Sequence, residues 1–414
     1  MKKLVALLLA LTLCIGLCAC GATAEKPAEE TPATTGETET PATDAKDIKV
    51  GFIFLHDENS TYDLNFINAA KAAAAELGLS DDQIMMKTNI AESQACYDAA
   101  AELVDAGCDL VITDSFGHES FALAAAKEFP EVQFVSCTGV KAHTEGLSNF
   151  HNAFASIYEG RYLAGVAAGL KLNEMIENGD ITAEEAKMGY VGAYPYAEVK
   201  SGYTSFFLGA RSICPSVTME VTFTSSWYDE ALEKEAANKL INNGCVLISQ
   251  HADSMGAPTA CETAGVPNVS YNGSTVAACP NTFIVSSRID WTPFFVYAIN
   301  CVASGEDIGY DWTGTLATGS VVLTDVNEAA AAAGTADKIA EVMKSLEDGS
   351  LKVFDTATFT VNGETLTTYL ADVDDLGDYV GETEVISDGV FLESFYRSAP
   401  YFDLDIDGIT NLDA

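Results

Sequence analysis

The feature that most constrains the fold of this chain is a regular alternation of short apolar runs with helical patterns, from Ile48 to Ser304. The runs lack a clean apolar–polar alternation, which is typical of strands whose two faces are both covered by helices. Strands that alternate with helices predict an α/β fold with doubly wound parallel sheets, and 414 residues are enough for two domains. The predicted strands are Ile48–Leu55, Asp109–Asp114, Val132–Cys137, Met188–Ala193, Val217–Phe223, Cys245–Gln250, Asn268–Tyr271 and Phe283–Ser287.

Two helical segments make further predictions. Tyr158–Leu170 is rich in glycine and alanine, and such small side chains allow a helix to pack closely against a sheet or another helix. Its charged residues make it a poor membrane span. From about Asp311 onward, the pattern predicts mixed short strands and one helix, Ala329–Leu346.

Polar and aromatic residues follow nearly every predicted strand. In open parallel sheets, the loops that leave the carboxyl ends of the strands are where ligands bind. Two sheets whose carboxyl ends face one crevice would clamp a small molecule between them. For the loop at 194–198, an ordinary solvent-facing loop is an equally good interpretation. The residues that we select as ligand-binding candidates from their position after a strand are Ser115, Tyr194, His251, Asp253, Asp290 and Trp291.

The first residues predict an extracytoplasmic protein. Lys2 and Lys3 precede an apolar run, Leu4–Leu17, that is too short for a spanning helix. Leu17-Cys18-Ala19-Cys20 resembles the lipobox of bacterial lipoproteins, so residues 1–20 are interpreted as a lipoprotein signal peptide and Cys20 as the lipidated residue. A plain secretory signal is the alternative. Residues 21–47 are mostly Glu, Thr, Pro and Ala with almost no large apolar side chain, which predicts a disordered tether.

The composition excludes several classes of partner. The formal net charge of −40 argues against binding to nucleic acid, whose phosphates require Lys and Arg. It also argues against direct adsorption to anionic lipid, so membrane attachment would depend on the lipid anchor. The cysteines that follow the signal peptide form no C-x-x-C pair, which argues against a zinc ribbon.

Five segments together carry a family resemblance: DLVITDSFGHESFALAAAKEFPEVQF, IYEGRYLAGVAAG, PYAEVKSGYTSFFLGARS, SSWYDEALEKEAANKLINNG and ISQHADSMG. They resemble the basic membrane protein (BMP, or PnrA-like) substrate-binding lipoproteins of ABC transporters, which bind purine nucleosides or bases. The resemblance implies a monomer with the type I periplasmic-binding-protein fold that delivers its purine to an ABC permease. It implies an N-terminal lobe of residues 48–155 and about 288–315, and a C-terminal lobe of about 156–287 and about 316–414.

The resemblance also implies roles for individual residues. Asn272 stands where nucleoside binders usually have an Asp that holds ribose hydroxyls, and Ile289 where many have a Lys. Ser60 stands where base-binding relatives often carry Trp. The first two departures favour a free base over a nucleoside. Tyr62 also lies on a predicted helix face, where core packing is the simpler interpretation. The residues that the resemblance adds to the candidate site are Asp57, Tyr62, Phe116, Glu198, Trp227 and Asn272.

Two other functions stay open at this stage. His56, His118 and His251 each follow a strand and stand near acidic residues, so they could ligate zinc in a metal-receptor lipoprotein, although no His-x-x-x-His supports this. Paired carboxylates near a cleft could instead hydrolyse the glycosidic bond of a nucleoside. The sequence shows no G-x-S-x-G, H-E-x-x-H or Walker A motif. We therefore favour a binding protein with neither a resident metal nor a cofactor.

Overall fold

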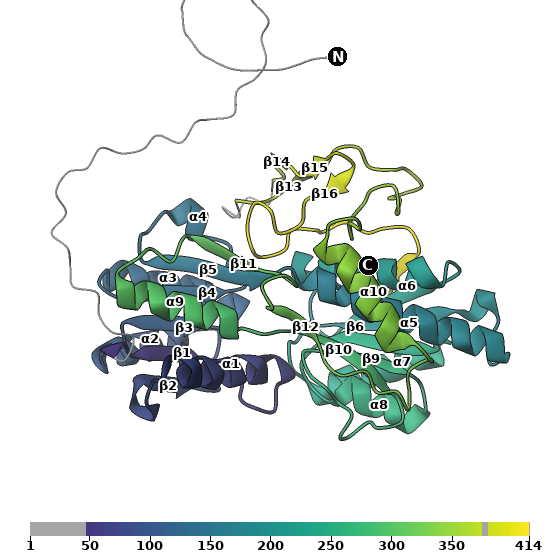
Figure 1. The fold of residues 1–414 in the computed structure, drawn as a ribbon, viewed down its shortest axis with the longest axis horizontal. Helices are drawn as coiled ribbons and strands as arrows, with labels where there is room; N and C mark the ends of the chain where they lie inside the picture. The colour runs from purple at the N-terminus through teal and green to yellow at the C-terminus, as the bar shows by residue number, and fades with distance from the viewer. Residues whose placement is uncertain (1–46, 375–379, 414) are drawn as a thin grey trace, which may run out of the picture. The chain divides into compact units, whose positions relative to one another are not determined.

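The computed structural model describes residues 47–374 and 380–413 (Figure 1). They belong to one compact unit, Ala42–Ala414. The predicted signal peptide, Cys20 and nearly all of the predicted tether lie outside the described residues. Among the residues that are described, no helix is both long and apolar enough to cross a membrane.

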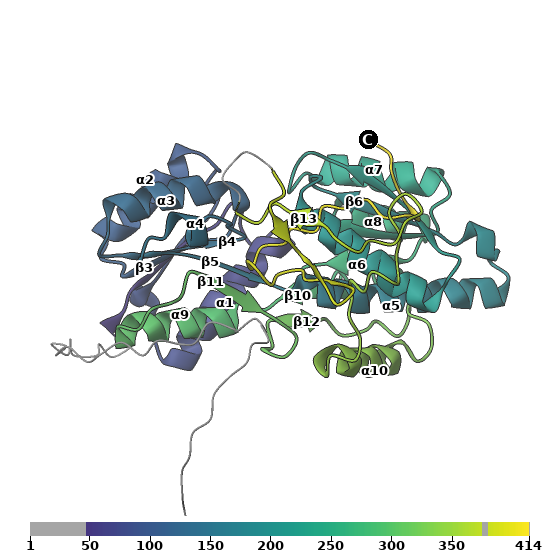
Figure 2. The ribbon, with the colours of Figure 1, turned by 90° about the horizontal axis from the view of Figure 1, so that it is seen from above.

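The first sheet has six parallel strands, and with its helices it forms what we call the N-terminal lobe. Its order is β11-β5-β4-β3-β1-β2. Helices α1 and α9 cover one face and α2 and α3 the other (Figure 2). The side chains of β1 alternate between these faces, with Phe52 in the core next to α1 and Ile53 in the core next to α2. The elements are β1 (Val50–Ile53), β2 (Ile84–Lys87), β3 (Leu110–Thr113), β4 (Gln133–Cys137), β5 (Phe150–Ala155), β11 (Asp311–Gly314), α1 (Thr61–Leu77), α2 (Gln94–Asp105), α3 (Glu119–Glu128), α4 (Ala142–Glu145) and α9 (Thr292–Ser304).

The second sheet has seven strands and forms, with its helices, the C-terminal lobe. Its order is β12-β10-β9-β8-β6-β7-β17, in which only the edge strand β12 is antiparallel to its neighbour. Helix α5 packs against α6, and α7 packs against α8. The elements are β6 (Lys187–Gly192), β7 (Thr218–Phe223), β8 (Leu247–His251), β9 (Asn268–Tyr271), β10 (Phe283–Ile289), β12 (Val321–Leu323), β17 (Ile409–Asn411), α5 (Ile157–Asn178), α6 (Ala197–Ile213), α7 (Glu230–Asn242), α8 (Gly256–Ala264) and α10 (Thr335–Glu347).

The chain passes between the two sheets three times, after β5, after β10 and after β11. The predicted α/β fold with parallel sheets is confirmed. The predicted helix 329–346 is wrong at its start, because α10 begins at Thr335. Gly334, just before it, has a φ of 79°, a left-handed conformation that a continuous right-handed helix does not contain.

The glycines of α5 allow its close approach to α6. A Cβ atom placed on Gly165 would lie 2.0 Å from the carbonyl oxygen of Phe206, and one placed on Gly209 would lie 2.1 Å from that of Tyr162. These are distances to helix backbone, which cannot turn aside as a side chain can. The close packing predicted from the small residues of this helix is therefore confirmed, and its partner is α6.

The segment after α10, described at residues 352–374 and 380–413, folds over the C-terminal lobe. Phe354 packs on Tyr158 of α5 and stacks on Phe402, and β17 adds a parallel strand beside β7. The segment also reaches the N-terminal lobe, where the backbone N–H of Ser398 donates to Asp311 Oδ2 at 2.8 Å. It contains two short antiparallel strand pairs, β13 (Leu370–Ala371) with β14 (Thr383–Glu384) and β15 (Ile386–Ser387) with β16 (Val390–Phe391).

Candidate ligand-binding cavity

A cavity with about 400 Å³ of empty space, part of it open to solvent, lies where the carboxyl ends of the two sheets meet. Its walls come from both lobes and combine aromatic rings with carboxyl groups and histidines. The lining residues are Leu55, His56, Tyr62, Asp63, Asp114, Ser115, Phe116, Thr138, Glu198, Trp227, His251, Asp253 and Tyr271.

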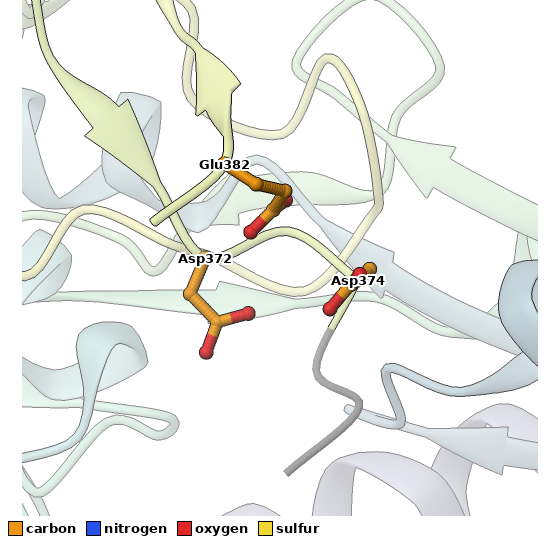
Figure 3. A group of neighbouring side chains, drawn as sticks. All are labelled: Asp372, Asp374 and Glu382. Atoms are coloured by element: carbon orange, nitrogen blue, oxygen red, sulfur yellow. The ribbon is translucent and has the colours of Figure 1, made fainter. Parts of the chain in front are cut away.

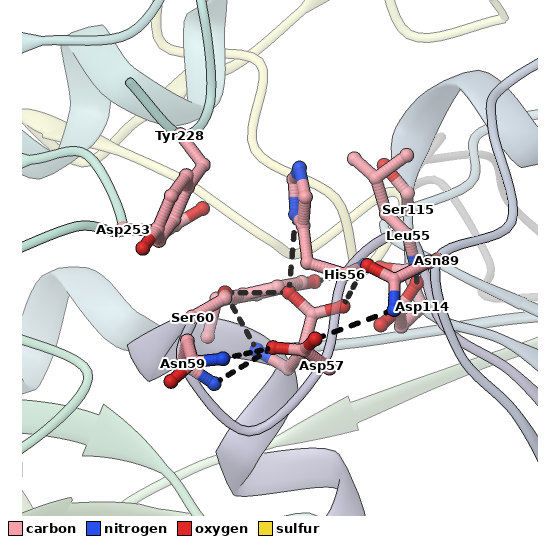
Figure 4. Close-up of polar contacts among 12 residues, drawn as sticks. Leu55, His56, Asp57, Asn59, Ser60, Asn89, Asp114, Ser115, Tyr228 and Asp253 are labelled. Carbon is pink, nitrogen blue, oxygen red and sulfur yellow. Dashed lines mark hydrogen bonds and ion pairs between the residues drawn. The ribbon is translucent and has the colours of Figure 1, made fainter. Parts of the chain in front are cut away.

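The loop after β1 is shaped by one buried carboxylate, Asp63, in the first turn of α1. Its Oδ1 accepts the backbone N–H of His56 at 2.7 Å, and its Oδ2 accepts the hydroxyl of Ser60 at 2.5 Å. Ser60 in turn caps α1 by accepting the N–H of Asp63. Figure 4 shows this loop, with His56 and Ser60 on one side and Tyr228 and Asp253 of the other lobe on the opposite side. The capping sequence therefore positions the His56 side chain at the cavity.

Asp114, at the end of β3, is fully buried beside Asp63. Its Oδ1 accepts the N–H of Leu55 at 3.1 Å, and its carbonyl oxygen accepts the Tyr62 hydroxyl at 2.8 Å. Burial, and then the neighbouring charge of Asp63, raise the pKa of Asp114 well above its usual range. Burial opposes ionisation of Asp63 too, but hydrogen bonds from His56, Asp114 and Ser60 lower the pKa of Asp63 overall. The pair therefore carries one negative charge, on Asp63.

The C-terminal lobe contributes a second buried acid, Asp253, in the loop after β8. Its Oδ1 accepts the side-chain amide N–H of Asn272 at 3.1 Å, and its backbone N–H donates to the carbonyl oxygen of Trp227 at 3.0 Å. Burial, and then the charges of Asp63, Glu233 and Glu198, raise the pKa of Asp253 well above its usual range. This side chain is thus fixed in orientation by Asn272.

The same loop joins the lobes. The carbonyl oxygen of Asp253 accepts both the backbone N–H and the hydroxyl of Thr61, at 3.1 and 3.2 Å. The amide of Asn65 donates to the carbonyl oxygen of Asn272 at 2.9 Å. Thr61 and Asn65 lie one turn apart on α1, so the first turns of this helix hold the two lobes together next to the cavity.

Aromatic rings close the cavity on its exposed side. Trp227 makes an edge contact with Tyr194, with centroids 5.1 Å apart, and Tyr194 stacks on Tyr196 at 5.1 Å. Tyr196 also meets Phe116 of the N-terminal lobe at 5.7 Å. On the same wall, His251 Nε2 lies 3.2 Å from Glu198 Oε1. A planar molecule in this cavity would meet ring faces as well as hydrogen-bonding groups.

The family model of PnrA-like ABC transporter substrate-binding proteins matches residues 53–351. The chain belongs to this family. The predicted family is therefore confirmed. The protein is a solute-binding component of an ABC transporter, and such receptors act outside the cytoplasm and pass small molecules to a permease.

Relatives of this PnrA-like protein include a purine-binding protein of Brucella abortus, 31% identical over 261 residues, which are 62% of this chain and 69% of the relative. A putative ABC transporter glucose-binding protein of Haloferax volcanii is 31% identical over 217 residues, 52% of each chain, so about half of that relative is spanned. A solute-binding protein from Aeropyrum pernix has a TM-score of 0.61 at 17% identity, covering 77% of this chain and 94% of its own. A solute-binding protein from Conexibacter woesei has a TM-score of 0.59 at 20% identity, covering 74% of this chain and 98% of its own. These two structures show the same fold.

The structure places some of the predicted site residues at the cavity of this PnrA-like protein and others away from it. Tyr194 supports Trp227, and Asn272 orients Asp253, without lining the cavity themselves. Asp57 accepts hydrogen bonds from Asn59 in an exposed turn (Figure 4). The predicted residues that line the cavity are Tyr62, Ser115, Phe116, Glu198, Trp227, His251 and Asp253.

The loop after β10 contains two predicted ligand-binding residues, but it lies away from the cavity. Trp291 is 0% exposed and stacks on Phe66 at 4.4 Å in the core of the N-terminal lobe. Asp290 accepts the N–H of Thr292 at 3.0 Å at the start of α9 and lies 3.4 Å from Arg288. Neither residue lines the cavity. The chain crosses to the N-terminal lobe directly after β10, and the loop there packs into the core of that lobe.

Sequence reasoning did not select six of the lining residues. His56 and Asp114 stand at strand ends, so their position was a usable signal. Asp63 follows Ser60 by three residues, as expected for an acid in a helix-capping pattern. Tyr271 ends an apolar strand and has the pattern of a core residue. The unselected residues are Leu55, His56, Asp63, Asp114, Thr138 and Tyr271.

The histidines do not converge on a metal site. His56 lies by Asp63 at 3.5 Å, His118 by Asp114 at 3.6 Å, and His251 by Glu198, so each has a separate partner. Within residues 47–374 and 380–413, one group of three potential ligands lies within 4.8 Å, namely Asp372, Asp374 and Glu382 (Figure 3). This group lies in the C-terminal segment and not at the cavity.

A buried acid on α7 supports the Asp253 loop and makes the stability of this PnrA-like protein pH-dependent. Glu233 Oε1 accepts the N–H groups of Asp229 and Ser254, each at 3.2 Å. Burial raises the pKa of Glu233 from 4.5 to about 7. Because the folded state binds this proton more tightly than the unfolded chain, its contribution to stability is lost as pH rises from about 4.5 to 7.

We therefore expect Glu233→Gln, which keeps an acceptor and cannot ionise, to be more stable than the unsubstituted protein above pH 7, by up to about 3 kcal/mol. At pH 4.5 the two proteins should be nearly equal. Urea unfolding at both pH values measures the difference, and the pH dependence from acids that do not interact with Glu233 is common to both proteins. Equal differences at the two pH values would contradict the prediction.

Proposed function

We propose that this protein is a lipid-anchored receptor that binds a purine base in the interlobe cavity and delivers it to an ABC permease. The observation that carries the proposal is that aromatic rings and buried carboxyl groups from both lobes meet in one cavity. A purine offers a π-face to Trp227 and Phe116, and an edge of donors and acceptors to Asp114 and Asp253. Stacking of a base on an aromatic side chain contributes about 1–3 kcal/mol in other proteins.

Features of β9 and β10 favour a free base over a nucleoside. The amide of Asn272 is engaged with Asp253, and Ile289 is only 2% exposed within the core. Neither side chain lines the cavity. The two positions at which nucleoside-binding relatives hold the ribose therefore provide no hydrogen bond to a ribose here. The purine-binding relative from Brucella abortus supports a purine in this cavity as well.

A hexose is the second candidate, because the relative from Haloferax volcanii is described as glucose-binding. Aromatic rings and carboxylates also suit sugars. A sugar, however, has no π-system that could stack on the rings of Trp227 and Phe116. The lipid anchor at Cys20 rests on the lipobox pattern and is tested by cell fractionation, in which the protein should sediment with membranes.

We expect a purine base to stabilise the purified protein and glucose and zinc to leave its thermal midpoint unchanged. A base at about 100 times its dissociation constant should add about 2.7 kcal/mol to the free energy of unfolding. The panel contains adenine, guanine, hypoxanthine, adenosine, guanosine, glucose and zinc, measured by thermal unfolding and then by calorimetric titration. A shift with glucose alone, or with no purine, would overturn the purine assignment and leave the family membership intact.

A further inference from the structure

Tyr271, the last residue of β9, carries a buried hydroxyl that no other group satisfies. The residue lines the cavity and is 2% exposed. Among the residues that the structure describes, its hydroxyl has no hydrogen-bond partner. A buried hydroxyl without a partner destabilises the fold, and such groups in native proteins usually have a role. The position of this residue in the cavity lining suggests what the role is.

The hydroxyl lies among groups that line the cavity from both lobes. The charges of Glu198 and Asp253 act on it from the C-terminal lobe, and it acts in turn on the hydroxyl of Tyr62 in the N-terminal lobe. Burial raises the pKa of Tyr271 well above its usual range. The phenol therefore keeps its proton at neutral pH and is a donor.

A buried cation stands behind the ring of Tyr271. The guanidinium carbon of Arg161 lies 5.2 Å from the ring centroid. Its N–H groups donate to the hydroxyls of Ser249 at 2.7 Å and Tyr190 at 3.2 Å. Among the described residues, no carboxylate lies within ion-pair distance of Arg161, so its charge is balanced by rings and neutral oxygens only.

This cation changes the donor strength of the phenol. A positive charge on one side of a phenol withdraws electron density from its ring and makes the O–H a stronger donor, and low polarity increases the effect. Arg161 is itself 0% exposed, so water does not screen it. The cavity thus has, besides its acidic groups, a neutral phenol donor.

We propose that Tyr271 determines ligand specificity, by donating a hydrogen bond from its hydroxyl to an acceptor atom of the bound heterocycle, a ring nitrogen or a carbonyl oxygen. This inference rests on the proposed function. The ionised carboxylate of Asp63 can accept from N–H groups of the ligand, but it repels acceptor atoms. Tyr271 supplies the donor that such an atom needs, and Arg161 is a positioning residue that supports the ring.

The test combines one substitution with matched analogues of the ligand. Tyr271→Phe removes only the hydroxyl and keeps the ring over Arg161. We expect it to weaken the base that binds best by about tenfold, the effect of one lost hydrogen bond. Analogues in which one ring nitrogen is replaced by C–H, or the carbonyl group is removed, identify the atom involved. The analogue that lacks the partner of Tyr271 should bind both proteins equally.

Tyr203→Phe is the matched control. Tyr203 is a buried tyrosine of the same lobe whose hydroxyl donates to Asp405, and it does not line the cavity. It should bind the base as the unsubstituted protein does, with thermal unfolding confirming that both variants fold. Equal losses in the two variants, no loss in Tyr271→Phe, or a loss of the same size for every analogue would overturn the proposal. Absence of any purine binding by the unsubstituted protein would instead overturn the proposed function.

Discussion

Trp227→Ala is expected to weaken purine binding by about 10- to 100-fold, the largest change in affinity that any single side chain of the cavity should produce. Trp227 lines the cavity, and its ring is held by the edge contact with Tyr194. Truncation removes the stacking surface and leaves a gap that water fills, so the ligand loses both dispersion contacts and exclusion from water. Calorimetric titration with the best-binding base measures the change in dissociation constant.

Two variants separate stacking from simple disturbance of the loop. Trp227→Phe keeps an aromatic face and should recover most of the affinity. Tyr194→Phe keeps the ring that supports Trp227 and should bind as the unsubstituted protein does. If Trp227→Ala bound the base as tightly as the unsubstituted protein, stacking on this residue would have no part in recognition.

The fold could be predicted because its determinants are local and periodic. Apolar strands such as 109–114, each followed by a helix, specify parallel pairing whatever their partners are. The start of α10 could not be predicted in the same way, since alanines 329–333 have high helix propensity and the turn before Thr335 depends on Gly334 and its surroundings. Local propensity and tertiary context disagree there, and the context prevails.

The cavity was harder to predict than the fold, because a strand end fixes position along a sheet but not the direction of a side chain. Ser115 and Asp253 face the cavity as expected from their position after β3 and β8. Trp291 occupies an equivalent position after β10, yet it turns into the core of the N-terminal lobe. Tyr271 differs in the opposite way, since its sequence pattern is that of a core residue and yet it lines the cavity. The crossing of the chain between the lobes explains the position of Trp291, and the buried cation Arg161 lies behind Tyr271. Both are properties of the tertiary structure.

Recognition and closure share residues in this receptor. The side chain of Asp253 faces the cavity, while its carbonyl oxygen accepts the hydrogen bonds of Thr61 from the other lobe. Asn272 orients that side chain and accepts a hydrogen bond from Asn65. A ligand that fixes the Asp253 loop therefore also fixes the acceptors that hold the lobes together. Contacts between the ligand and this loop would therefore stabilise the arrangement in which the two lobes are held together.

The second large effect concerns stability and is expected for Gly165→Ala, which should lower the free energy of unfolding by about 3 kcal/mol. In an exposed helix, the same change would raise stability by about 1 kcal/mol, because alanine has the higher helix propensity. Here the new Cβ would lie 2.0 Å from the carbonyl oxygen of Phe206, so α5 and α6 must separate along their length. The clash exceeds the propensity gain, and the sign of the effect reverses.

Gly273→Ala is the control for this prediction, since its Cβ would meet Thr61 at an ordinary 3.6 Å and should change stability by less than about 0.5 kcal/mol. Urea unfolding of both variants and the unsubstituted protein measures the difference. Because the α5–α6 contact belongs to the C-terminal lobe alone, the loss should be the same with and without ligand. A stabilised Gly165→Ala protein would show that the two helices separate at little cost, and that their glycines are not what sets the distance between them.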